Sequence, residues 1–369
     1  MMSITYLLLS RTYGMHLYTA DLAQAVLDAG GAVQLVTVQG YPAHIYDPRV
    51  QVDAIWPSSG GTMAADPLLR GGVGRVISAV RRARPDVVHI SGPQLLTPLV
   101  MQGLRRDGIP LLHTLHDLDP HPGAIYGRLL HLWNRSVIAS ADGFLVHGEV
   151  YRQRLLDMRA GPRRIVQLPL LHLFLGHIAA QELASLSVDE KRDALALFFG
   201  RVTRYKGVDV LLKAWAALDA QPERWRLVVA GEGDDSAGLM APLPPDVERR
   251  DHLVEDAEAI ALFRACRVLV LPYIGATQSA LIPAAYYFGM PVIATRSGAL
   301  PEYVVEGETG WLVPEGNAAA LAQALDEALG DPERCRRMGA AGRAWYDRER
   351  ARERTELMKL YDQVAQKGQ

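Results

Sequence analysis

Short apolar runs alternate with amphipathic stretches along most of the chain. In the first half, apolar residues at helical spacing predict helices at 16–29, 68–83, 95–106 and 125–139. The apolar runs between them predict strands at 4–10, 33–38, 52–56, 86–90, 110–115 and 143–147. This alternation is typical of a parallel, doubly wound sheet with helices on both faces. Such sheets place their ligands at the carboxyl ends of the strands.

A second series of the same kind follows a connector at 161–191. Its expected strands are 194–199, 226–230, 268–271 and 292–294, and its expected helices are 208–218, 256–264, 279–288 and 317–329. A chain of 369 residues is too long for one ordinary core. The pattern therefore predicts an α/β protein with two Rossmann-like domains of similar size.

Two further segments have apolar patterns of their own. The connector contains a run at 168–175 that is more apolar than a linker, which favours packing across an interdomain cleft over contact with a lipid-like acceptor. The tail at 343–365 is rich in charge but has one apolar helix face. That face consists of Trp345, Leu357, Leu360, Tyr361 and Val364. We expect this helix to pack back over the domain junction.

Composition excludes several classes of protein. A net charge of −2 and a pI near 6.6 give no basic footprint for nucleic acid. Two distant cysteines, Cys266 and Cys335, predict neither a disulfide framework nor a zinc site, and they fit a reducing compartment. Arginines cluster locally, which favours a solvated helix face over a patch for an anionic membrane surface. The clustered residues are Arg75, Arg81, Arg82, Arg84, Arg105 and Arg106.

The N-terminal run has the character of a strand. It lacks the basic region and small-residue cleavage site of a signal peptide, and no segment reaches about 18 continuous apolar residues. We therefore expect a cytoplasmic protein, with peripheral contact at the inner face of the membrane as an open alternative.

The segment at 198–207, F-F-G-R-V-T-R-Y-K-G, follows a predicted strand and precedes a helix. It carries Arg201 and Lys206 near the amide end of that helix, where negative charge is favoured, so a phosphate or diphosphate is its natural ligand. Taken alone, such a loop is more often an ordinary solvated connection.

A second polar loop follows the strand at 110–115. His116 is expected at the carboxyl edge of the first sheet, where it could donate or shuttle a proton for a bound hydroxyl. The alternative is a turn whose Asp and Pro residues only shape the backbone. Asp117 and Asp119 form a lone D-x-D with no third ligand nearby, so we expect no metal.

Two loops of the second series are also candidates. Residues 228–234 run from a strand into a glycine turn, for which a simple tight turn is a sufficient explanation. Residues 274–279 follow another strand, and Ser279 is a candidate N-cap whose neighbouring amides could face an anion.

Taken together, these motifs resemble a known family. Six motifs in this order resemble the donor domain of the retaining GT-B glycosyltransferases of family 4. They are F-F-G-R-V-x-x-x-K-G, V-A-G-E-G, L-P-Y, A-x-x-F-G-M-P-V-I-A-T, G-x-L-P-E and G-E-T-G-W-L-V-P. The similarity covers about 194–314. It is looser in the first half, where the first strand, the Tyr13-Gly14 loop and His116-Asp117 carry it.

The resemblance implies a GT-B fold, in which two Rossmann-like domains face each other across a cleft. It implies an acceptor-binding domain at 1–175, a nucleotide-sugar domain at 176–342, and a helix at 343–369 that crosses back to the N-terminal domain. The helix with Trp345 and Tyr361 resembles the crossover segment of the family.

The resemblance also assigns roles to single residues. Arg201 and Lys206 match the pair that clamps the donor diphosphate, and His116 matches a histidine near the donor sugar. The remaining donor-binding positions are Tyr13, Gly14, Gly200, Gly231, Leu253, Val254, Thr277, Gln278, Ser279 and Ala280, with Leu253 and Val254 at the nucleobase. Acceptor-binding positions are Asp117 and His121.

Catalysis in the family is understood as same-face substitution with retention, without an enzyme nucleophile, a metal or a cofactor. The nucleotide sugar is a co-substrate, and the clamp stabilises the charge on the leaving diphosphate. One departure stands out: the two glutamates usual in the family correspond to Ala276 and Ala284 here. Gln278 and Ser279 could replace the first, and no replacement is evident for the second, which contacts ribose.

Three hypotheses follow. The first is a bacterial, metal-independent, retaining glycosyltransferase that joins a nucleotide-sugar donor to a sugar, lipid-linked or small-molecule acceptor in polysaccharide, glycolipid or natural-product synthesis. The second is an inactive GT-B-like binding or scaffold protein. The third is a nucleotide-sugar 2-epimerase, for which Asp117 and Asp119 are the available acidic groups. The donor base, the acceptor and the oligomeric state stay open.

Overall fold

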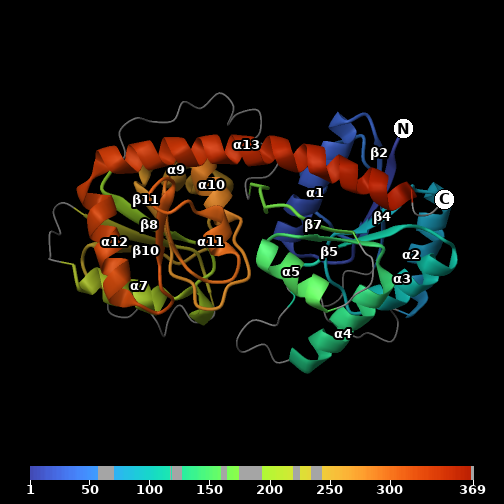
Figure 1. Cartoon of the computed structure of the whole chain (residues 1–369), viewed down its shortest axis with the longest axis horizontal. Helices are drawn as coiled ribbons and strands as arrows, with labels where there is room; N and C mark the ends of the chain where they lie inside the picture. The colour runs from blue at the N-terminus through green and yellow to red at the C-terminus, as the bar shows by residue number, and fades with distance from the viewer. Residues whose placement is uncertain are drawn as a thin grey trace. The chain divides into compact units, whose positions relative to one another are not determined.

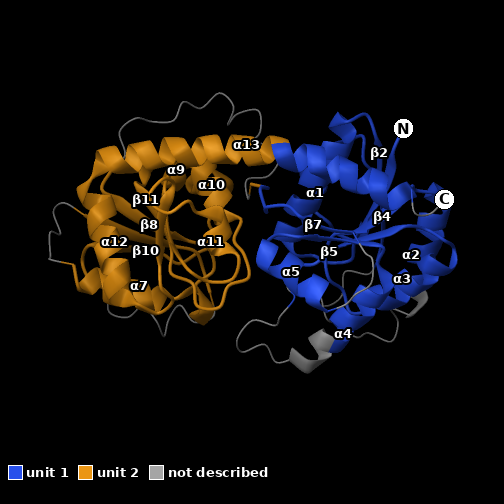
Figure 2. Cartoon of the chain, in the orientation of Figure 1, with its two compact units in different colours: residues 1–172, 352–369 blue, residues 173–351 orange. Residues whose placement is uncertain are grey.

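The computed structural model describes residues 1–56, 70–116, 118, 127–158, 164–173, 193–218, 225–233 and 243–366. The chain separates into two compact units (Figure 2). Unit 1 comprises Met1–His172 and Arg352–Gln369, and unit 2 comprises Leu173–Ala351. The domain limits predicted from the sequence stay a prediction.

Unit 1 is built on a seven-stranded sheet in the order β3-β2-β1-β4-β5-β6-β7. All neighbouring strands pair in parallel. The strands are β1 (Ser3–Leu8), β2 (Ala32–Val38), β3 (Gln51–Trp56), β4 (Val87–Ile90), β5 (Leu111–Thr114), β6 (Gly143–Val146) and β7 (Arg164–Gln167). Parallel strands need crossover connections, and helices on both faces supply them (Figure 1). These helices are α1 (Tyr13–Asp28), α2 (Arg70–Ala83), α3 (Thr97–Arg106), α4 (Gly127–Ser140) and α5 (Glu149–Asp157).

Unit 2 is built on a six-stranded parallel sheet in the order β10-β9-β8-β11-β12-β13. Its strands are β8 (Leu195–Phe199), β9 (Arg226–Ala230), β10 (Val247–Arg250), β11 (Val268–Leu271), β12 (Val292–Thr295) and β13 (Gly310–Val313). Its helices are α7 (Val208–Ala216), α9 (Asp256–Ala265), α10 (Leu281–Tyr287), α11 (Leu300–Tyr303) and α12 (Ala318–Gly330). The predicted doubly wound α/β architecture is therefore confirmed in both units.

The last helix, α13 (Pro332–Ala365), contributes to both units and changes colour along its length in Figure 2. The five residues predicted to share its apolar face are all buried, at 8% exposure or less. In unit 2, the Trp345 ring packs against Tyr286 with the ring centroids 5.5 Å apart. In unit 1, the Arg354 guanidinium donates to the backbone oxygen of Asp21 at 2.7 Å and to its carboxylate at 3.1 Å.

Three strands and two helices of the described part of the chain were absent from the predicted pattern. The missed strands, β7, β10 and β13, all lie at the edge of a sheet, where a strand pairs with only one neighbour. The sequence of β10 is V-E-R-R and that of β7 is R-I-V-Q, so neither has the apolar run of a central strand. Of the two missed helices, α5 buries only Tyr151 and Leu155, and α11 is a single turn of 4 residues, Leu300–Tyr303. None of the helices in the described part of the chain combines the length and the apolar character needed to cross a membrane.

Leu357 tests the packing of α13 in unit 1, because its side chain is fully buried. We expect Leu357→Ala to lower the free energy of unfolding by about 2–5 kcal/mol, since it removes buried methyl groups and leaves a cavity. Urea denaturation followed by tryptophan fluorescence measures the change. The control is Lys359→Ala. The Lys359 ammonium is exposed and pairs with Glu356, so its loss should lower the free energy of unfolding by less than about 1 kcal/mol. Equal shifts in the two variants would contradict the packing.

Candidate functional site

The basic loop of unit 2 leaves the carboxyl end of β8 and is held against the neighbouring turn after β9. The amide of Gly200 donates to Ala230 O at 2.9 Å, and the amide of Val202 donates to Glu232 O at 3.0 Å. A short 3-10 turn, η3 (Arg204–Lys206), then leads through Gly207 into α7. The loop is thus a fixed structure at the start of a helix, where backbone amides favour an anion.

Lys206 is the cation most strongly shaped by this loop. Its Nζ lies 5.2 Å from the centroid of the Tyr273 ring, so the ammonium rests against an aromatic face. Burial lowers the pKa of Lys206 below its ordinary value, and the positive charge of Arg201 lowers it further. Arg201 itself has an exposed side chain. Two positive charges therefore act on each other here, and one of them has lost much of its hydration.

Two glycines make this arrangement possible. Gly200 has φ +106°, and a Cβ there would lie 2.9 Å from Lys206 Nζ. Gly231 has φ +131°, and a Cβ there would collide with the backbone of Gly200. Both backbone conformations are ones that residues with a side chain rarely adopt. The two strand ends can therefore approach closely only because both positions are glycine.

The loop after β11 packs against the basic loop. The amide of Ile274 donates to Tyr205 O at 2.6 Å, and the amide of Ala299 donates to Thr277 O at 3.0 Å. Two buried side-chain oxygens in these loops, Thr203 Oγ1 and Gln278 Oε1, have no hydrogen-bond partner among the described residues. Buried polar atoms are normally paired, so these two are available to a ligand.

Ser279 is not the N-cap that the sequence suggested. The helix α10 begins two residues later, and Ala280 is its N-cap. The Ser279 hydroxyl still accepts a hydrogen bond from the amide of Leu281 at 3.3 Å, so it serves the helix start from one position further out. Ala276 and Ala284 are both buried, at 5% and 0% exposure. Neither offers a polar side chain to a ligand.

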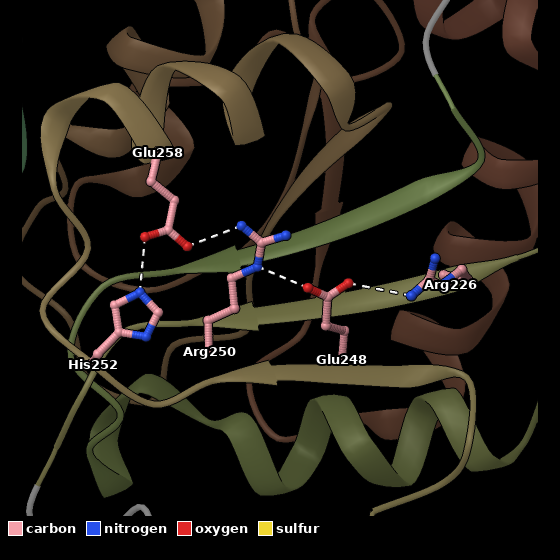
Figure 3. A network of polar contacts seen from close by, with 5 residues as sticks. All are labelled: Arg226, Glu248, Arg250, His252 and Glu258. Carbon is pink, nitrogen blue, oxygen red and sulfur yellow. Dashed lines mark hydrogen bonds and ion pairs between the residues drawn. The ribbon is translucent and has the colours of Figure 1, made fainter.

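The segment after β10 is held by a chain of alternating charges (Figure 3). Arg250 donates to Glu248 at 2.8 Å and to Glu258 at 2.9 Å, and Glu258 also pairs with His252 at 2.8 Å. Arg226 on β9 extends the chain through Glu248 at 3.2 Å. The network joins two strands, the segment 251–255 and the first turn of α9.

This network has a consequence for the predicted nucleobase contacts. Leu253 is 75% exposed and Val254 is half-buried, so both lie at the surface of unit 2. His252 immediately precedes them and is tied to Glu258, whose pKa is held below its ordinary value by the hydrogen bond from His252 and then by Arg250. The charges thus restrain a segment that has little apolar packing of its own.

In unit 1, His116 lies where the sequence predicted, just beyond the carboxyl end of β5. It is 6% exposed, and its Nε2–H donates to Ser91 O at 2.9 Å, since a carbonyl oxygen can only accept. In its neutral form the ring therefore carries its lone pair on Nδ1. Asp117, Asp119 and His121 lie outside the described residues.

Tyr13 and Gly14 were predicted in a loop, and the structure corrects this. They form the first turn of α1, because the amides of Met15 and His16 already bond to Thr12 O. The Tyr13 side chain is 41% exposed and stacks on His44 with the ring centroids 6.2 Å apart. Both residues nevertheless follow the carboxyl end of β1, from which residues 9–12 separate them.

Sequence reasoning missed two further histidines at this edge. His147 directly follows β6 and is 1% exposed, and its Nδ1–H donates to Leu168 O at 3.0 Å. His172 follows β7 and is 8% exposed. The ring of Tyr18 on α1 contacts both of them and His116. A histidine after each of three successive strands was the signal available in the sequence.

A metal ion needs a set of ligand side chains that lie close together. Within the described ranges, no three or more His, Cys, Asp and Glu side chains group in a way that could hold a metal ion. The candidate functional groups are the cations Arg201 and Lys206 in unit 2 and the imidazole rings in unit 1.

Comparison with known proteins gives consistent matches over both units. Residues 13–170 match the family model "Glycosyl transferase 4-like domain", and residues 193–331 match "Glycosyl transferases group 1". A D-inositol 3-phosphate glycosyltransferase of Frankia alni is 31% identical over 290 residues, which is 70% of each chain. One from Streptomyces scabiei is 30% identical over 271 residues, or 65% of this chain. The chain spans only 59% of the length of that relative and 56% of a second from Streptomyces avermitilis.

Solved structures share the whole fold at low sequence identity. Sucrose-phosphate synthase of Thermosynechococcus elongatus superposes with a TM-score of 0.77 at 21% identity, covering 99% of both chains. Anabaena HepE in complex with UDP and glucose has a TM-score of 0.71 at 17% identity, again over 99% of both chains. These similarities confirm that the fold is GT-B.

Gly200→Ala tests the close approach of the two strand ends. The added methyl group must displace the Lys206 ammonium, so we expect binding of inorganic pyrophosphate to weaken by at least about tenfold in calorimetric titration. Gly316→Ala is the matched control, because Gly316 also has a positive φ but has open space around it. If both variants lost the same amount of pyrophosphate affinity, backbone strain alone, and not the position of the ammonium, would account for the loss.

Glu258→Gln tests the charge network. A carboxylate with a lowered pKa stabilises the fold fully above its ordinary pKa of 4.5, and this contribution is lost as the pH falls through the lowered value. We therefore expect the variant to melt at a lower temperature than the wild type at pH 7 and the difference to shrink below about pH 4. Thermal melting across this range measures it, with the exposed Glu315→Gln as control. A difference that does not change with pH would contradict a role for the charge.

Proposed function

The chain belongs to the group 1 glycosyl transferases, and from that premise we propose that it transfers a sugar from a nucleotide-diphosphate sugar to an acceptor hydroxyl. The observation that carries the proposal is the pair of interacting cations, Arg201 and Lys206, in a loop fixed at the start of α7. Neither cation is needed for the packing of the sheet. Both are suited to a dianionic group.

The electrostatics of the pair explain how it would act. Burial and the charge of Arg201 make the protonated state of Lys206 less favourable than in water, and a bound diphosphate would relieve both effects. When the bond from sugar to diphosphate breaks, negative charge develops on the leaving oxygen. Groups fixed in advance at that place stabilise the transition state without having to reorganise.

We further propose the finer features of the reaction. In our proposal Arg201 and Lys206 neutralise the leaving diphosphate, so the reaction requires no metal, and the sugar is transferred with retention of configuration. The leaving oxygen accepts the proton of the incoming hydroxyl. Thr203 Oγ1 and Gln278 Oε1, which lack partners among the described residues, would hydrogen-bond the donor.

The substrates are proposed from chemistry and from the named relatives. HepE was solved with UDP and glucose, so a UDP-sugar is the first donor to test. The curated relatives are named for inositol 3-phosphate, a molecule rich in hydroxyl groups. A sugar or another polyol is accordingly our proposed acceptor.

An inactive binding protein on the same fold is the second candidate. The observation that favours it is the pair Ala276 and Ala284, both buried and both without hydrogen-bonding side chains. The two cations of the basic loop favour the enzyme, because a protein that only binds partners does not require a clamp for a diphosphate. Donor turnover distinguishes the two.

Lys206→Ala and Arg201→Ala test the proposed role directly. We expect each to lower the rate of UDP-sugar turnover by at least about 10²-fold, because each removes charge from the developing anion, while the melting temperature stays close to that of the wild type. Lys213→Ala on α7 is the control, since that ammonium is exposed and pairs with Asp209. Calorimetric titration with UDP, GDP, ADP and TDP, without and with magnesium, identifies the base.

The outcomes separate the two candidates. Binding of one nucleotide without metal, lost in Lys206→Ala, together with turnover of its sugar, supports the transferase. Binding without turnover of any donor favours the inactive protein. Near-wild-type turnover in either alanine variant would overturn the assignment of the clamp.

A further inference from the structure

Three neighbouring strands of unit 1 each deliver a histidine to the same edge. β5, β6 and β7 lie side by side, and His116, His147 and His172 follow them in that order. The Tyr18 ring stands among the three imidazoles, with centroid distances of 5.0, 5.3 and 5.6 Å and interplanar angles of 81°, 90° and 66°. We refer to His116, His147, His172 and Tyr18 as the imidazole cluster.

The backbone fixes the tautomers of two of these rings. His116 donates through Nε2 to Ser91 O, and His147 donates through Nδ1 to Leu168 O. In their neutral forms the two rings therefore carry lone pairs on opposite nitrogens, Nδ1 of His116 and Nε2 of His147. Their ring centroids are 5.2 Å apart. Burial lowers the pKa of His147 well below its ordinary value, so this ring is neutral at physiological pH.

Tyr18 is held in place by a buried chain of hydrogen bonds. Its hydroxyl lies 3.1 Å from Thr114 Oγ1, which lies 2.7 Å from His89 Nε2. His89 Nδ1 lies 2.8 Å from the hydroxyl of Tyr361 on α13, and that hydroxyl lies 2.7 Å from the hydroxyl of Tyr6. All five side chains are at most 2% exposed. The register pairs Tyr6 with His89 and His89 with Leu112, so Tyr6, His89 and Thr114 lie on one face of the sheet, and the chain runs along that face from the imidazole cluster to the C-terminal helix.

The proton count makes Thr114 the critical link. His89 is buried and its pKa lies well below the ordinary value, so the ring is neutral and donates only once. If His89 donates to Tyr361, the single Thr114 proton must go to His89, and Tyr18 must then donate to Thr114. In the opposite tautomer, His89 donates to Thr114. In both cases Thr114 Oγ1 is the atom that satisfies the Tyr18 hydroxyl.

We propose that Tyr18, anchored through Thr114, is a positioning residue that orients the imidazole cluster, and that His147 joins His116 in binding the acceptor hydroxyl. The part of this inference that concerns the acceptor rests on the proposed function. Neutral imidazole lone pairs accept hydrogen bonds from hydroxyl groups, so the cluster suits an uncharged hydroxyl. The rigid edge-on contacts with Tyr18 set the direction of those lone pairs.

Thr114→Val tests the anchoring. Valine has the shape of threonine, but it leaves the buried Tyr18 hydroxyl without its partner, and we expect the ring to leave its position against the imidazoles. Histidine-selective NMR should then show changed shifts or titration for His116 and His147. His16 serves as an internal reference, because its ring is fixed elsewhere by Ser10 O and Tyr46.

Rescue separates this positioning role from general damage. Adding Tyr18→Phe to Thr114→Val removes the unsatisfied hydroxyl while keeping the ring, so we expect the histidine spectra to return towards those of the wild type. Tyr361→Phe should act in the same direction as Thr114→Val but more weakly, since His89 can still donate to Thr114. Unchanged spectra in Thr114→Val, or a double variant as perturbed as the single one, would overturn the anchoring.

His147→Asn tests the acceptor contact. The asparagine amide can replace the Nδ1–H that donates to Leu168 O, but it has no atom in place of Nε2. With water as the simplest hydroxyl acceptor, we expect hydrolysis of UDP-glucose to fall by at least about tenfold while the Kd for UDP stays within about twofold. His116→Gln, which keeps the donor to Ser91 O, should behave alike.

The NMR experiment and the hydrolysis experiment test the two parts of the proposal independently. If wild-type protein neither binds UDP nor hydrolyses UDP-glucose, the proposed donor is wrong, whereas the NMR arm still tests the anchoring of Tyr18. If wild-type protein turns over UDP-glucose and His147→Asn does so at the same rate, the role of His147 is wrong and the proposed function stands.

Discussion

Parallel strand pairing is the constraint on which both candidate sites depend. Because all strands of each sheet run in the same direction, the loops that leave their carboxyl ends collect at one edge. In unit 2 the register pairs Phe199 with Ala230, so Gly200 and Gly231 follow side by side, and only glycine tolerates that approach. In unit 1 the same geometry gathers three histidines from β5, β6 and β7. The side-chain chemistry of both units is thus a consequence of backbone hydrogen bonding within the sheets.

The central strands and the basic loop could be predicted from the sequence because their signals are local. A strand buried on both faces needs a continuous apolar run, and Arg201 and Lys206 lie five positions apart in one loop. The missed strands are edge strands. For β7 and β10 the missing signal is physical, since an edge strand pairs with only one neighbour and has less need of apolar residues. In β10, the charged residues Glu248 and Arg250 contribute to the ion-pair network instead of to a core.

The imidazole cluster was missed in the sequence for a different reason. Tyr18, His116, His147 and His172 are far apart along the chain, and only the strand order β5-β6-β7 makes the histidines neighbours. A resemblance to a family identifies single positions such as His116, but it does not show which side chains orient the residues at those positions. Tyr361 illustrates this: its place on an apolar helix face was predictable, whereas the hydrogen bond between its hydroxyl and His89 Nδ1 depends on the fold of unit 1.

The two units differ in the charge of their candidate sites, and this difference suits a reaction between unlike partners. Unit 2 keeps an ammonium beside a guanidinium, an arrangement that an anionic diphosphate stabilises. In unit 1, burial is the largest cause of the lowered pKa of His89, His113 and His147, so these three rings are neutral at physiological pH. A neutral imidazole can accept a hydrogen bond from an uncharged hydroxyl, whereas it has no positive charge with which to attract an anion. The charge of each site therefore matches one of the two proposed substrates and disfavours the other.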